Sequence, residues 1–488
     1  MNALSGTRKK KLFLIHPRFE VRSFNRNAGT LIPLGLAYIA AYTPDHWEVE
    51  IHDEQEQDPI LPDADLVGIS TTTGSIMRAY EIARIYRERK IPVIMGGIHA
   101  STLPDEAIAH CDSVVIGDAE PVWETVIADF ERGALQRKYV SPIPPLDNLR
   151  QPRRDLLKGK YLFGSISTSR GCPFRCTFCA IHNFYQHTYR MRPIEEVIAE
   201  LKTMRQRLIF FTDGNLFGYT APARERFVEL CKRLVEERRR GSFHYLGWMA
   251  YATVNILEDE EALTLAAQAG CISLLIGFES INENTLKEMK KGVNIKRLSQ
   301  YRELIANARR HGILVTAELV LGFDNDTQET LELTRKFVRE ADIDVLRLQI
   351  LQPLPGTEVF AKLAKEGRLY LSTFPQDWTK LWDQFFLGIN FEMKSLDPYE
   401  LIRMVTETGK EFYSVPAILK RGLRLMAIQR SPFAFLYYTS IAFKSRGMYK
   451  NYTLCRETLN ASIAEGRKRR TLAPSAETRD PPRPQASA

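Results

Sequence analysis

Strand-length apolar runs alternate with helical patterns twice along this chain, and that alternation constrains its fold more than any other feature. Alternating strands and helices predict a parallel sheet with helices on both faces. A proline-rich stretch between residues 141 and 152 separates the two series, because proline removes a backbone donor and blocks helices. We therefore predict an α/β protein with two successive parallel-sheet units, the first a doubly wound sheet.

The two series differ in length. The first has expected strands at 12–15, 49–51, 66–70, 93–95 and 113–116, and expected helices at 34–42, 76–89 and 121–132. The second has expected strands at 164–169, 208–212, 246–251, 272–278, 314–321 and 345–350, and expected helices at 193–205, 222–239, 260–269, 295–310 and 327–340. Residues 374–465 follow with helical periodicity and many aromatic side chains.

Small and polar residues follow three strands of the first series. They are Gly68, Ser70, Thr71 and Thr72 after one strand, Gly96, Gly97 and His99 after the next, and Gly117 and Glu120 after a third. Glycines let the backbone approach a ligand, and hydroxyls supply hydrogen bonds. Open parallel sheets bind ligands at the carboxyl ends of their strands. Each segment alone is compatible with a simple turn, but three at corresponding positions predict a cofactor groove.

Composition narrows the functional classes. The 488 residues are 44% hydrophobic, which is ample for buried cores, and we expect neither a signal peptide nor a membrane-spanning helix. The net charge of +8 is partly carried by residues 466–488, a Pro-, Ser- and Ala-rich tail with six basic and two acidic residues that we expect to be disordered. The body is only mildly basic, so no nucleic-acid partner is expected. Seven cysteines, three of them clustered, favour the reducing cytoplasm.

Cys172, Cys176 and Cys179 form that cluster, with the spacing CxxxCxxC. Iron–sulfur clusters are held mostly by Cys thiolates, and three close thiolates can hold three irons of a four-iron cluster and leave the fourth open to a small molecule. That arrangement is catalytic, because a structural site would be closed by a fourth protein ligand. A structural zinc site that includes His182, and disulfide-bonded or unrelated thiols, are the alternatives.

The cysteine motif, with Phe178 directly before its last cysteine, resembles the radical S-adenosylmethionine (SAM) superfamily. The resemblance implies that the second series is a partial (βα)6 barrel, in which functional residues stand at the carboxyl ends of the strands. It also implies that SAM binds the open iron of a 4Fe-4S cluster and is cleaved by an electron into methionine and a 5′-deoxyadenosyl radical. It places Phe178, Asp213, Asn215, Gly277, Glu279 and Glu318 around SAM. An N-cap role is the alternative for acidic residues such as Asp213.

The first series resembles the cobalamin-binding domain found ahead of many radical SAM enzymes, on residues 33–41 and 53–54 and on the three strand-end segments. The resemblance implies that those segments contact cobalamin. The D-x-H-x-x-G motif of many other cobalamin proteins is absent, since none of the histidines at 16, 46, 52, 99 or 110 has an Asp two positions before it. His99 is therefore expected to be a groove residue rather than the lower ligand of cobalt.

Residues 10–460 as a whole resemble the cobalamin-binding-domain radical SAM family. The resemblance implies C-methylation of an unactivated carbon in a lipid, tetrapyrrole or natural product. An oxidative cyclase of tetrapyrroles is the nearest alternative. A tRNA methylthiotransferase is disfavoured because its extra cysteine triad and RNA-binding barrel are not evident, and a non-enzymatic cobalamin-binding regulator is the remaining alternative.

The expected division is a cobalamin-binding-like domain at 10–140, a linker at 141–160, the barrel at 161–370, a helical substrate-capping region at 371–465 and the tail at 466–488. Expected partners are a small, apolar substrate and reduced flavodoxin or ferredoxin as electron donor. The apolar run 433–443 with its basic neighbours is either a buried helix beside a solvated face or a surface that contacts a membrane or a lipid-like substrate.

Overall fold

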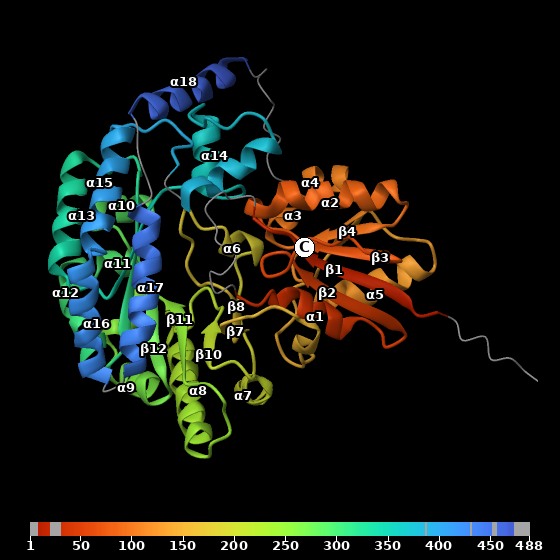
Figure 1. The fold of residues 1–488 in the computed structure, drawn as a ribbon, viewed down its shortest axis with the longest axis horizontal. Helices are drawn as coiled ribbons and strands as arrows, with labels where there is room; N and C mark the ends of the chain where they lie inside the picture. Colours follow the sequence, from red (N-terminus) through yellow and green to blue (C-terminus); the bar gives the residue numbers. More distant parts are fainter. Residues whose placement is uncertain (1–7, 20–30, 386–387, 430–431, 451–455, 473–488) are drawn as a thin grey trace, which may run out of the picture.

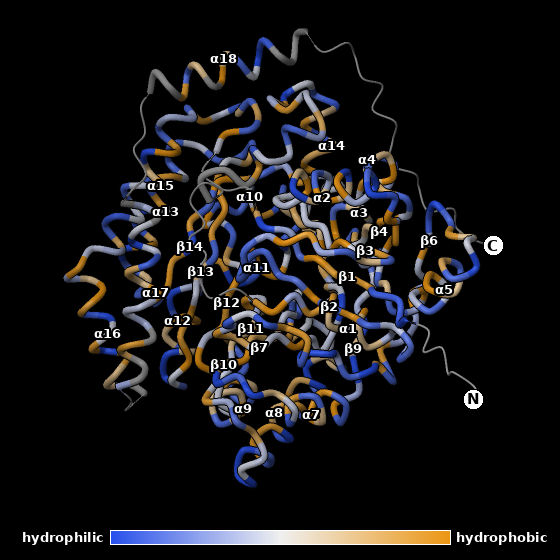
Figure 2. Tube along the Cα trace, turned by 45° about the vertical axis from the view of Figure 1, so that its right-hand side comes forward, coloured by the Kyte–Doolittle hydropathy of each residue, from blue (hydrophilic) through white to orange (hydrophobic). Residues whose placement is uncertain are grey.

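The computed structural model describes residues 8–19, 31–385, 388–429, 432–450 and 456–472. Its two main parts each contain a six-stranded parallel sheet, and a layer of C-terminal helices lies along the second sheet, on the side away from the first (Figure 1). The predicted α/β class with two parallel-sheet units is confirmed. Apolar residues concentrate along the strands of both sheets, as Figure 2 shows.

The N-terminal sheet has the strand order β2-β1-β3-β4-β5-β6. Its strands are β1 Lys10–His16, β2 Trp47–Asp53, β3 Leu66–Ser70, β4 Val93–Gly96, β5 Ser113–Ile116 and β6 Lys138–Val140. Its helices are α1 Leu34–Tyr42, α2 Ile76–Glu88, α3 Ile98–Thr102, α4 Pro104–His110 and α5 Glu120–Glu131, with the 3-10 turn η1 Thr73–Ser75. Because β2 lies on one side of β1 and β3 on the other, the winding direction reverses at β1, where a doubly wound sheet forms its ligand crevice.

Two apolar cores sandwich this sheet. Helices α1 and α5 cover one face, where Leu36 and Trp123 pack against Leu14 of β1. Helices α2 and α4 cover the other face, where Tyr86 packs against Phe13. The burial of both faces explains why the strands read as continuous apolar runs rather than as alternating patterns.

The second sheet has the order β14-β13-β12-β11-β10-β7, so β7 and β14 are its edges. Its strands are β7 Phe163–Ile166, β10 Leu208–Phe211, β11 Gly247–Ala252, β12 Cys271–Glu279, β13 Leu314–Leu321 and β14 Val345–Ile350. Its helices and turns are η2 Arg154–Leu156, α6 Ile181–Phe184, α7 Ile194–Thr203, α8 Ala221–Arg239, η3 Val254–Glu258, α9 Glu260–Gln268, α10 Glu283–Glu288, α11 Gly292–Ile295, η4 Leu298–Gln300, α12 Tyr301–Arg310, α13 Gln328–Glu340 and α14 Glu358–Lys365. A short antiparallel hairpin, β8 Ser169–Gly171 and β9 Tyr189–Met191, brackets the cysteine loop and was not predicted.

Part of the C-terminal helical region seals the open edge of this sheet. The helices of the region are α15 Pro398–Phe412, α16 Val415–Gln429, α17 Pro432–Lys450 and α18 Arg456–Leu472, preceded by the 3-10 segment η5 Gln376–Phe385. The Tyr413 hydroxyl accepts a hydrogen bond from the Leu346 N–H at 3.0 Å and donates one to the Leu346 carbonyl at 2.8 Å. Tyr449 makes the same two contacts with Leu348, both at 3.3 Å. These hydroxyls replace the strand neighbour that β14 lacks, which protects the edge from pairing with another chain.

The expected substrate-capping role of residues 371–465 stays a prediction, and only part of that region lies at the barrel mouth. Helices α15 and α17 lie along the β14 edge, while the segment before α15 reaches the carboxyl ends of the strands. There Met393 contacts Gly322, directly after β13, and Gln352 donates to the Gly388 carbonyl at 2.9 Å. The part of the region that covers the barrel mouth is thus short.

The expected disordered tail also begins too early. Helix α18 continues to Leu472, and the structure gives a reason, because Gly466 packs against the Tyr370 ring and Arg467 forms an ion pair with Glu392 at 2.9 Å. The rest of the expected tail, residues 473–488, lies outside the described residues. Within the part of the chain that the structure describes, we find no helix with the length and apolarity needed to cross a bilayer.

Candidate active site

The three clustered cysteines lie on one loop that other segments hold in place. The loop follows Gly171, whose positive φ of 91° and whose contact with the Thr188 carbonyl exclude any side chain at that position. Thr177, between the second and third cysteines, donates its N–H to the Met289 carbonyl at 3.3 Å and accepts from the Val359 N–H at 3.0 Å. The loop is thus anchored by the segment after α10 and by the start of α14.

The thiols share one electrostatic environment. Burial raises the pKa of Cys172 and of Cys176 to about 11 and also raises that of Cys179. Each thiol is influenced by the charge of another, and the Lys291 ammonium lowers the pKa of all three. Since iron ligation needs thiolates, a positive charge beside all three thiols favours the ligating form.

Lys291 and Glu279 form a buried ion pair at the end of β12. Their side-chain nitrogen and oxygen lie 2.8 Å apart, and each side chain is less than a tenth exposed. Burial lowers the pKa of Lys291, but the Glu279 carboxylate and the nearby thiols outweigh it and raise the pKa above its ordinary value. Sequence reasoning found Glu279 and missed Lys291, whose partner is known only once β12 and the segment after α10 are placed together.

The Glu279 side chain lies directly against Gly277, at an irregular end of β12. Glu279 has a positive φ of 63°, and the pairing of β12 with β13 is irregular between these residues. A Cβ at position 277 would lie 2.2 Å from the Glu279 side-chain oxygen, so any larger residue there would displace the Glu279 carboxylate from its present place. A non-glycine residue in this backbone region is strained, and such strain concentrates at functional sites.

Phe178 and Glu318 border the same region. Phe178 is partly buried, with its ring 5.9 Å from that of Phe323 in an edge-on arrangement. Glu318, on β13, lies 3.1 Å from the Arg347 guanidinium of β14, and burial raises the pKa of its carboxyl. Arg347, like Lys291, was not singled out from the sequence.

Asp213 and Asn215 are placed differently from the expectation. Asp213 is fully buried and accepts hydrogen bonds from the Thr168 N–H, the Thr168 hydroxyl and the Ser169 hydroxyl at 3.0, 2.8 and 2.5 Å. Asn215 is fully buried and donates to the Thr253 hydroxyl at 3.1 Å. Their polar atoms are engaged within the protein. The contacts of Asp213 favour bracing of the strand before the cysteine loop over direct contact with SAM, and those of Asn215 tie the end of β10 to the end of β11.

His182, the residue of the zinc alternative, lies against another histidine. Its ring is 5.2 Å from that of His187, and its pKa is lowered by burial and then by the His187 charge. As the side chains lie here, no three His, Cys, Asp or Glu residues of the described part form a group that could hold a metal ion.

A cavity of about 260 Å³ lies at the carboxyl ends of the N-terminal strands, at the predicted groove. Six predicted groove residues line it: Gly68, Ser70, Gly96, Gly97, Gly117 and Glu120. Gly97 and Gly117 have positive φ values of 92° and 91°, which glycine adopts without strain. The absence of side chains there keeps the strand ends open to a flat ligand.

Thr71, Thr72 and His99 do not line this cavity, which corrects the prediction for them. The Thr71 hydroxyl donates to the Gly96 carbonyl at 2.8 Å, and Thr72 caps the turn that begins helix α2. His99 is fully buried on the other face of the sheet, with its ring nitrogens 3.2 Å from Thr73 and Glu106 oxygens. Its burial under Trp378 removes it as a ligand of a metal in the groove.

The opposite wall of the cavity belongs to the second main part, where residues after β7 and β10 and around the cysteine loop form it. Ser167, Arg170, Phe184, Tyr185 and Thr212 complete it. The Arg170 guanidinium lies 2.5 Å from Glu120 and 3.0 Å from Asp118. Because Arg170 precedes Cys172 by only two residues, one buried ionic contact joins the N-terminal groove to the cysteine loop.

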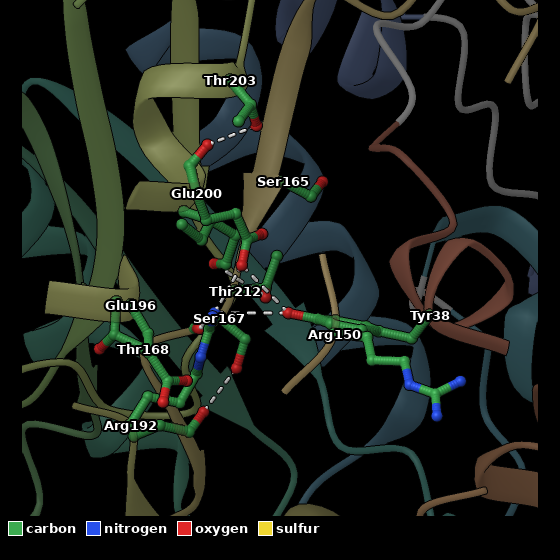
Figure 3. A network of polar contacts seen from close by, with 12 residues as sticks. Tyr38, Arg150, Ser165, Ser167, Thr168, Arg192, Glu196, Glu200, Thr203 and Thr212 are labelled. Atoms are coloured by element: carbon green, nitrogen blue, oxygen red, sulfur yellow. Dashed lines mark hydrogen bonds and ion pairs between the residues drawn. The ribbon is translucent and has the colours of Figure 1, made fainter. Parts of the chain in front are cut away.

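A second buried network joins the two main parts just behind this wall (Figure 3). Glu200, fully buried on α7, lies 2.5 Å from Arg154 and 2.8 Å from Arg192. The Tyr38 hydroxyl of α1 points to the same carboxylate and donates to it at 3.3 Å. Burial and the Glu200 charge raise the pKa of Tyr38 far above its ordinary value, so the hydroxyl keeps its proton. The Nε atoms of Arg154 and Arg192 have no partner in this network, but its ion pairs and hydrogen bonds still link α1 to α7 across the two main parts.

Comparison with known proteins agrees with this architecture. The family model of the radical SAM superfamily matches residues 166–338, and the model of the B12 binding domain matches residues 25–127. The chain is 29% identical to bacteriochlorophyllide d C-12(1)-methyltransferase of Chlorobaculum tepidum, over 85% of this chain and 89% of that protein. It is 30% identical to hopanoid C-2 methylase of Rhodopseudomonas palustris, over 76% of this chain and 73% of that protein.

Similar proteins also include an anaerobic magnesium-protoporphyrin IX monomethyl ester cyclase of Rubrivivax gelatinosus, at 24% identity over 84% of this chain and 78% of that protein. Among solved structures, the radical SAM methyltransferase TsrM of Kitasatospora setae, with cobalamin and a [4Fe-4S] cluster bound, shares the fold with a TM-score of 0.62. Its identity is 17%, over 95% of this chain and all of that chain. The predicted family is thus confirmed, and this chain belongs to the radical SAM enzymes that carry an N-terminal B12-binding domain.

Proposed function

We propose that this enzyme is a cobalamin-dependent C-methyltransferase that acts on an unactivated carbon of a small, largely apolar substrate of the lipid, tetrapyrrole or natural-product type. The observation that carries the proposal is the shared wall of the cavity, where the strand ends of the B12-binding domain face the strand that leads into the cysteine loop. The methyltransferases among the similar proteins support the same chemistry.

The residues present suit the groups that this chemistry needs. Cys172, Cys176 and Cys179 would hold three irons of a 4Fe-4S cluster, because they lie on one loop and the charge of the Lys291 ammonium acts on all three thiols. The cavity lined by Gly68, Gly96 and Gly117 would take cobalamin, since glycine backbone borders it at the ends of the strands. When bound, the cluster with SAM supplies a 5′-deoxyadenosyl radical and cobalamin supplies a methyl group.

The protein's own contribution is to hold these sites in register and to keep water out. Arg170 fixes the distance between groove and cysteine loop through Asp118 and Glu120. Glu279, Lys291 and Glu318 would orient the polar end of SAM, with Phe178 and Gly277 bordering it. Asp213 would brace the segment before the loop through Thr168, and Asn215 would tie the end of β10 to Thr253 after β11. Enclosure of this kind protects reactive intermediates from solvent.

The electron donor in this proposal is reduced flavodoxin or ferredoxin, and the location is the reducing cytoplasm, where thiolate ligands persist. Contact with a membrane surface is also proposed, on separate grounds. An oxidative cyclase would use the same cofactors without transferring a methyl group.

The test is product analysis of anaerobically purified protein that has been reconstituted with iron, sulfide and hydroxocobalamin. With SAM, a chemical reductant and extracts containing apolar acceptors, the methyltransferase should release both 5′-deoxyadenosine and S-adenosylhomocysteine. Cys176→Ala should lose iron and both products. Cys231→Ala is the matched control, because Cys231 is also buried but lies on the core-facing side of α8, outside the cysteine loop.

Other results would redirect the proposal. Deoxyadenosine without S-adenosylhomocysteine would favour the cyclase. Bound cobalt with no SAM cleavage would favour a regulatory protein, and retained SAM cleavage in Cys176→Ala would contradict the assignment of the three cysteines.

A further inference from the structure

The α16–α17 hairpin has an unusual charge composition. Between residues 412 and 450 the chain has seven Lys or Arg residues and no Asp or Glu. The whole protein carries 67 basic and 59 acidic residues, so this segment holds a concentrated excess of positive charge. The fold and the proposed chemistry do not require that excess, because the cofactor sites lie on other elements.

Large apolar side chains are exposed on the same two helices. On α16 they are Val415, Leu419 and Leu423, spaced four residues apart and therefore on one face of the helix. On α17 they are Leu436, which is 64% exposed, and Phe443, which is 44% exposed. We call these five residues the apolar stripe. The stripe belongs to both helices of the hairpin rather than to one.

The core-facing sides of the helices are fully engaged, so the stripe is not an unfinished core. Ile418 and Leu425 of α16 are fully buried, and Tyr438 and Tyr449 of α17 reach the protein interior. Gly422 packs against Phe435 and Thr439, which brings the two helices into close contact. Both views place α16 and α17 at the edge of the molecule opposite the B12-binding domain (Figures 1 and 2).

Basic groups accompany the stripe. Lys420 and Lys444 are exposed, one beside Leu419 and the other beside Phe443. Arg421, Arg424 and Arg446 instead bond to the protein, through the Tyr438 hydroxyl, Asp342 and the Tyr413 carbonyl. The hairpin therefore combines exposed apolar and positive side chains, while Arg424 ties it to Asp342 of the barrel and Arg421 and Arg446 bond within the C-terminal helical region.

We propose that this hairpin is a docking surface for a membrane that contains anionic phospholipid. Apolar residues that insert into the headgroup region and basic residues that contact anionic headgroups are the two features that bind interfacial helices. Among the described residues no helix is long and apolar enough to span a bilayer, so the contact is peripheral. An acidic protein partner would match the charge, but it would leave five exposed apolar residues without a role.

The experiment is vesicle flotation of the full-length protein, with vesicles of phosphatidylcholine alone or mixed with phosphatidylglycerol. We expect binding to the mixed vesicles, at least about tenfold weaker binding to the neutral ones, and weakening by salt. Leu423→Ser with Leu436→Ser should reduce binding to the mixed vesicles at least about tenfold, and Lys420→Ala with Lys444→Ala should abolish the preference for anionic lipid.

The control exchanges exposed apolar residues elsewhere, Ile60→Ser with Leu162→Ser, and should bind like the unchanged protein. Unfolding midpoints show whether each variant is folded. Because vesicle binding does not require cofactor turnover, this test and the test of the methyltransferase proposal can fail independently. No binding to mixed vesicles, or binding that the stripe variant retains, would overturn the proposal. The proposal would also be overturned if the protein bound reduced flavodoxin instead of vesicles and the stripe variant no longer bound flavodoxin.

Discussion

The Lys291 ammonium lies 2.8 Å from the Glu279 carboxylate, and both side chains are buried next to the three cysteines. A buried pair contributes little net stability relative to apolar residues, but the loss of one partner leaves an uncompensated buried charge. The effect of a substitution at Lys291 on stability therefore depends on the residue at position 279, and the reverse also holds. The backbone of Glu279 is already strained at this point.

We expect Lys291→Met and Glu279→Gln each to lower the free energy of unfolding by about 3–5 kcal/mol, and the double variant to lose clearly less than the sum. Urea denaturation of the cofactor-free protein under reducing conditions measures all three. The exposed pair Lys287 and Glu283 is the control, and its coupling should be about 0.3–0.5 kcal/mol. Additive losses at Lys291 and Glu279 would show that the two side chains do not interact as described.

Gly117→Val should remove cobalamin binding. The substitution forces a β-branched residue into a positive φ and places its side chain at the cavity wall. Gly133→Val is the matched control, because Gly133 also has a positive φ, but open space surrounds its Cβ position and it lies after α5. Titration with hydroxocobalamin, followed by absorption, should show binding in the control and not in Gly117→Val. Equal binding by both variants would move the cobalamin site elsewhere.

Asp324 should make the stability of the segment over the barrel mouth depend on pH. Burial raises its pKa, but Arg368 and Lys362 outweigh burial and hold the pKa at about 2, below the ordinary 3.8. Between about pH 4 and pH 2 the Asp324 carboxyl therefore stays ionised in the folded protein, whereas in the unfolded chain it takes up a proton. The stabilisation is present above about pH 4 and is lost as the pH falls toward 2.

Because water screens this half-buried site, we expect Asp324→Asn to cost on the order of 1 kcal/mol at pH 7. Unfolding midpoints of both proteins between pH 3 and 7 test this, and the difference between them should shrink only below about pH 4. Limited proteolysis near residue 394 should also be faster in Asp324→Asn than in the unchanged protein, since Lys394 is among the ion-pair partners of Asp324. A constant difference across the pH range would exclude this ion-pair cluster as the cause.

Tyr449→Phe should destabilise the barrel edge although it removes a single oxygen atom. Without that hydroxyl the Leu348 N–H and carbonyl lose their partner in a buried setting, which costs about 1–3 kcal/mol. Tyr413→Phe should act in the same way on Leu346. Tyr219→Phe, at a partly exposed position, should change stability by less than about 0.5 kcal/mol. Thermal unfolding compares the three, and equal midpoints would contradict the sealing role of the hydroxyls.

Elements with apolar runs could be predicted from the sequence, even short ones such as β4 and β5, whereas short polar ones could not. Strand β12 was recognised because most of its residues are apolar and buried. The hairpin of β8 and β9 has three residues in each strand and is rich in polar side chains. It forms because its strands pair with each other, which no local pattern reveals.

The same distinction applies to the site. The cysteines and Gly277 carry local signals, whereas Arg170 and Lys291 gain their roles from Glu120 and Glu279, which folding brings close. His99 shows the reverse error. Its position after a strand pointed to the groove, but helix α3 turns it into the core. The packing of the next helix decides on which face of the sheet a residue after a strand end lies.

Two phenol hydroxyls, rather than another strand, complete the hydrogen bonding at β14, and this limits how the enzyme can be divided. A chain cut near residue 370 would retain every residue assigned to the cofactors but would expose the backbone of an apolar edge strand. Such fragments would associate through that strand, and their assembly would reflect the cut rather than the enzyme. The smallest independently folding catalytic unit therefore includes helices that contribute no residue to the chemistry.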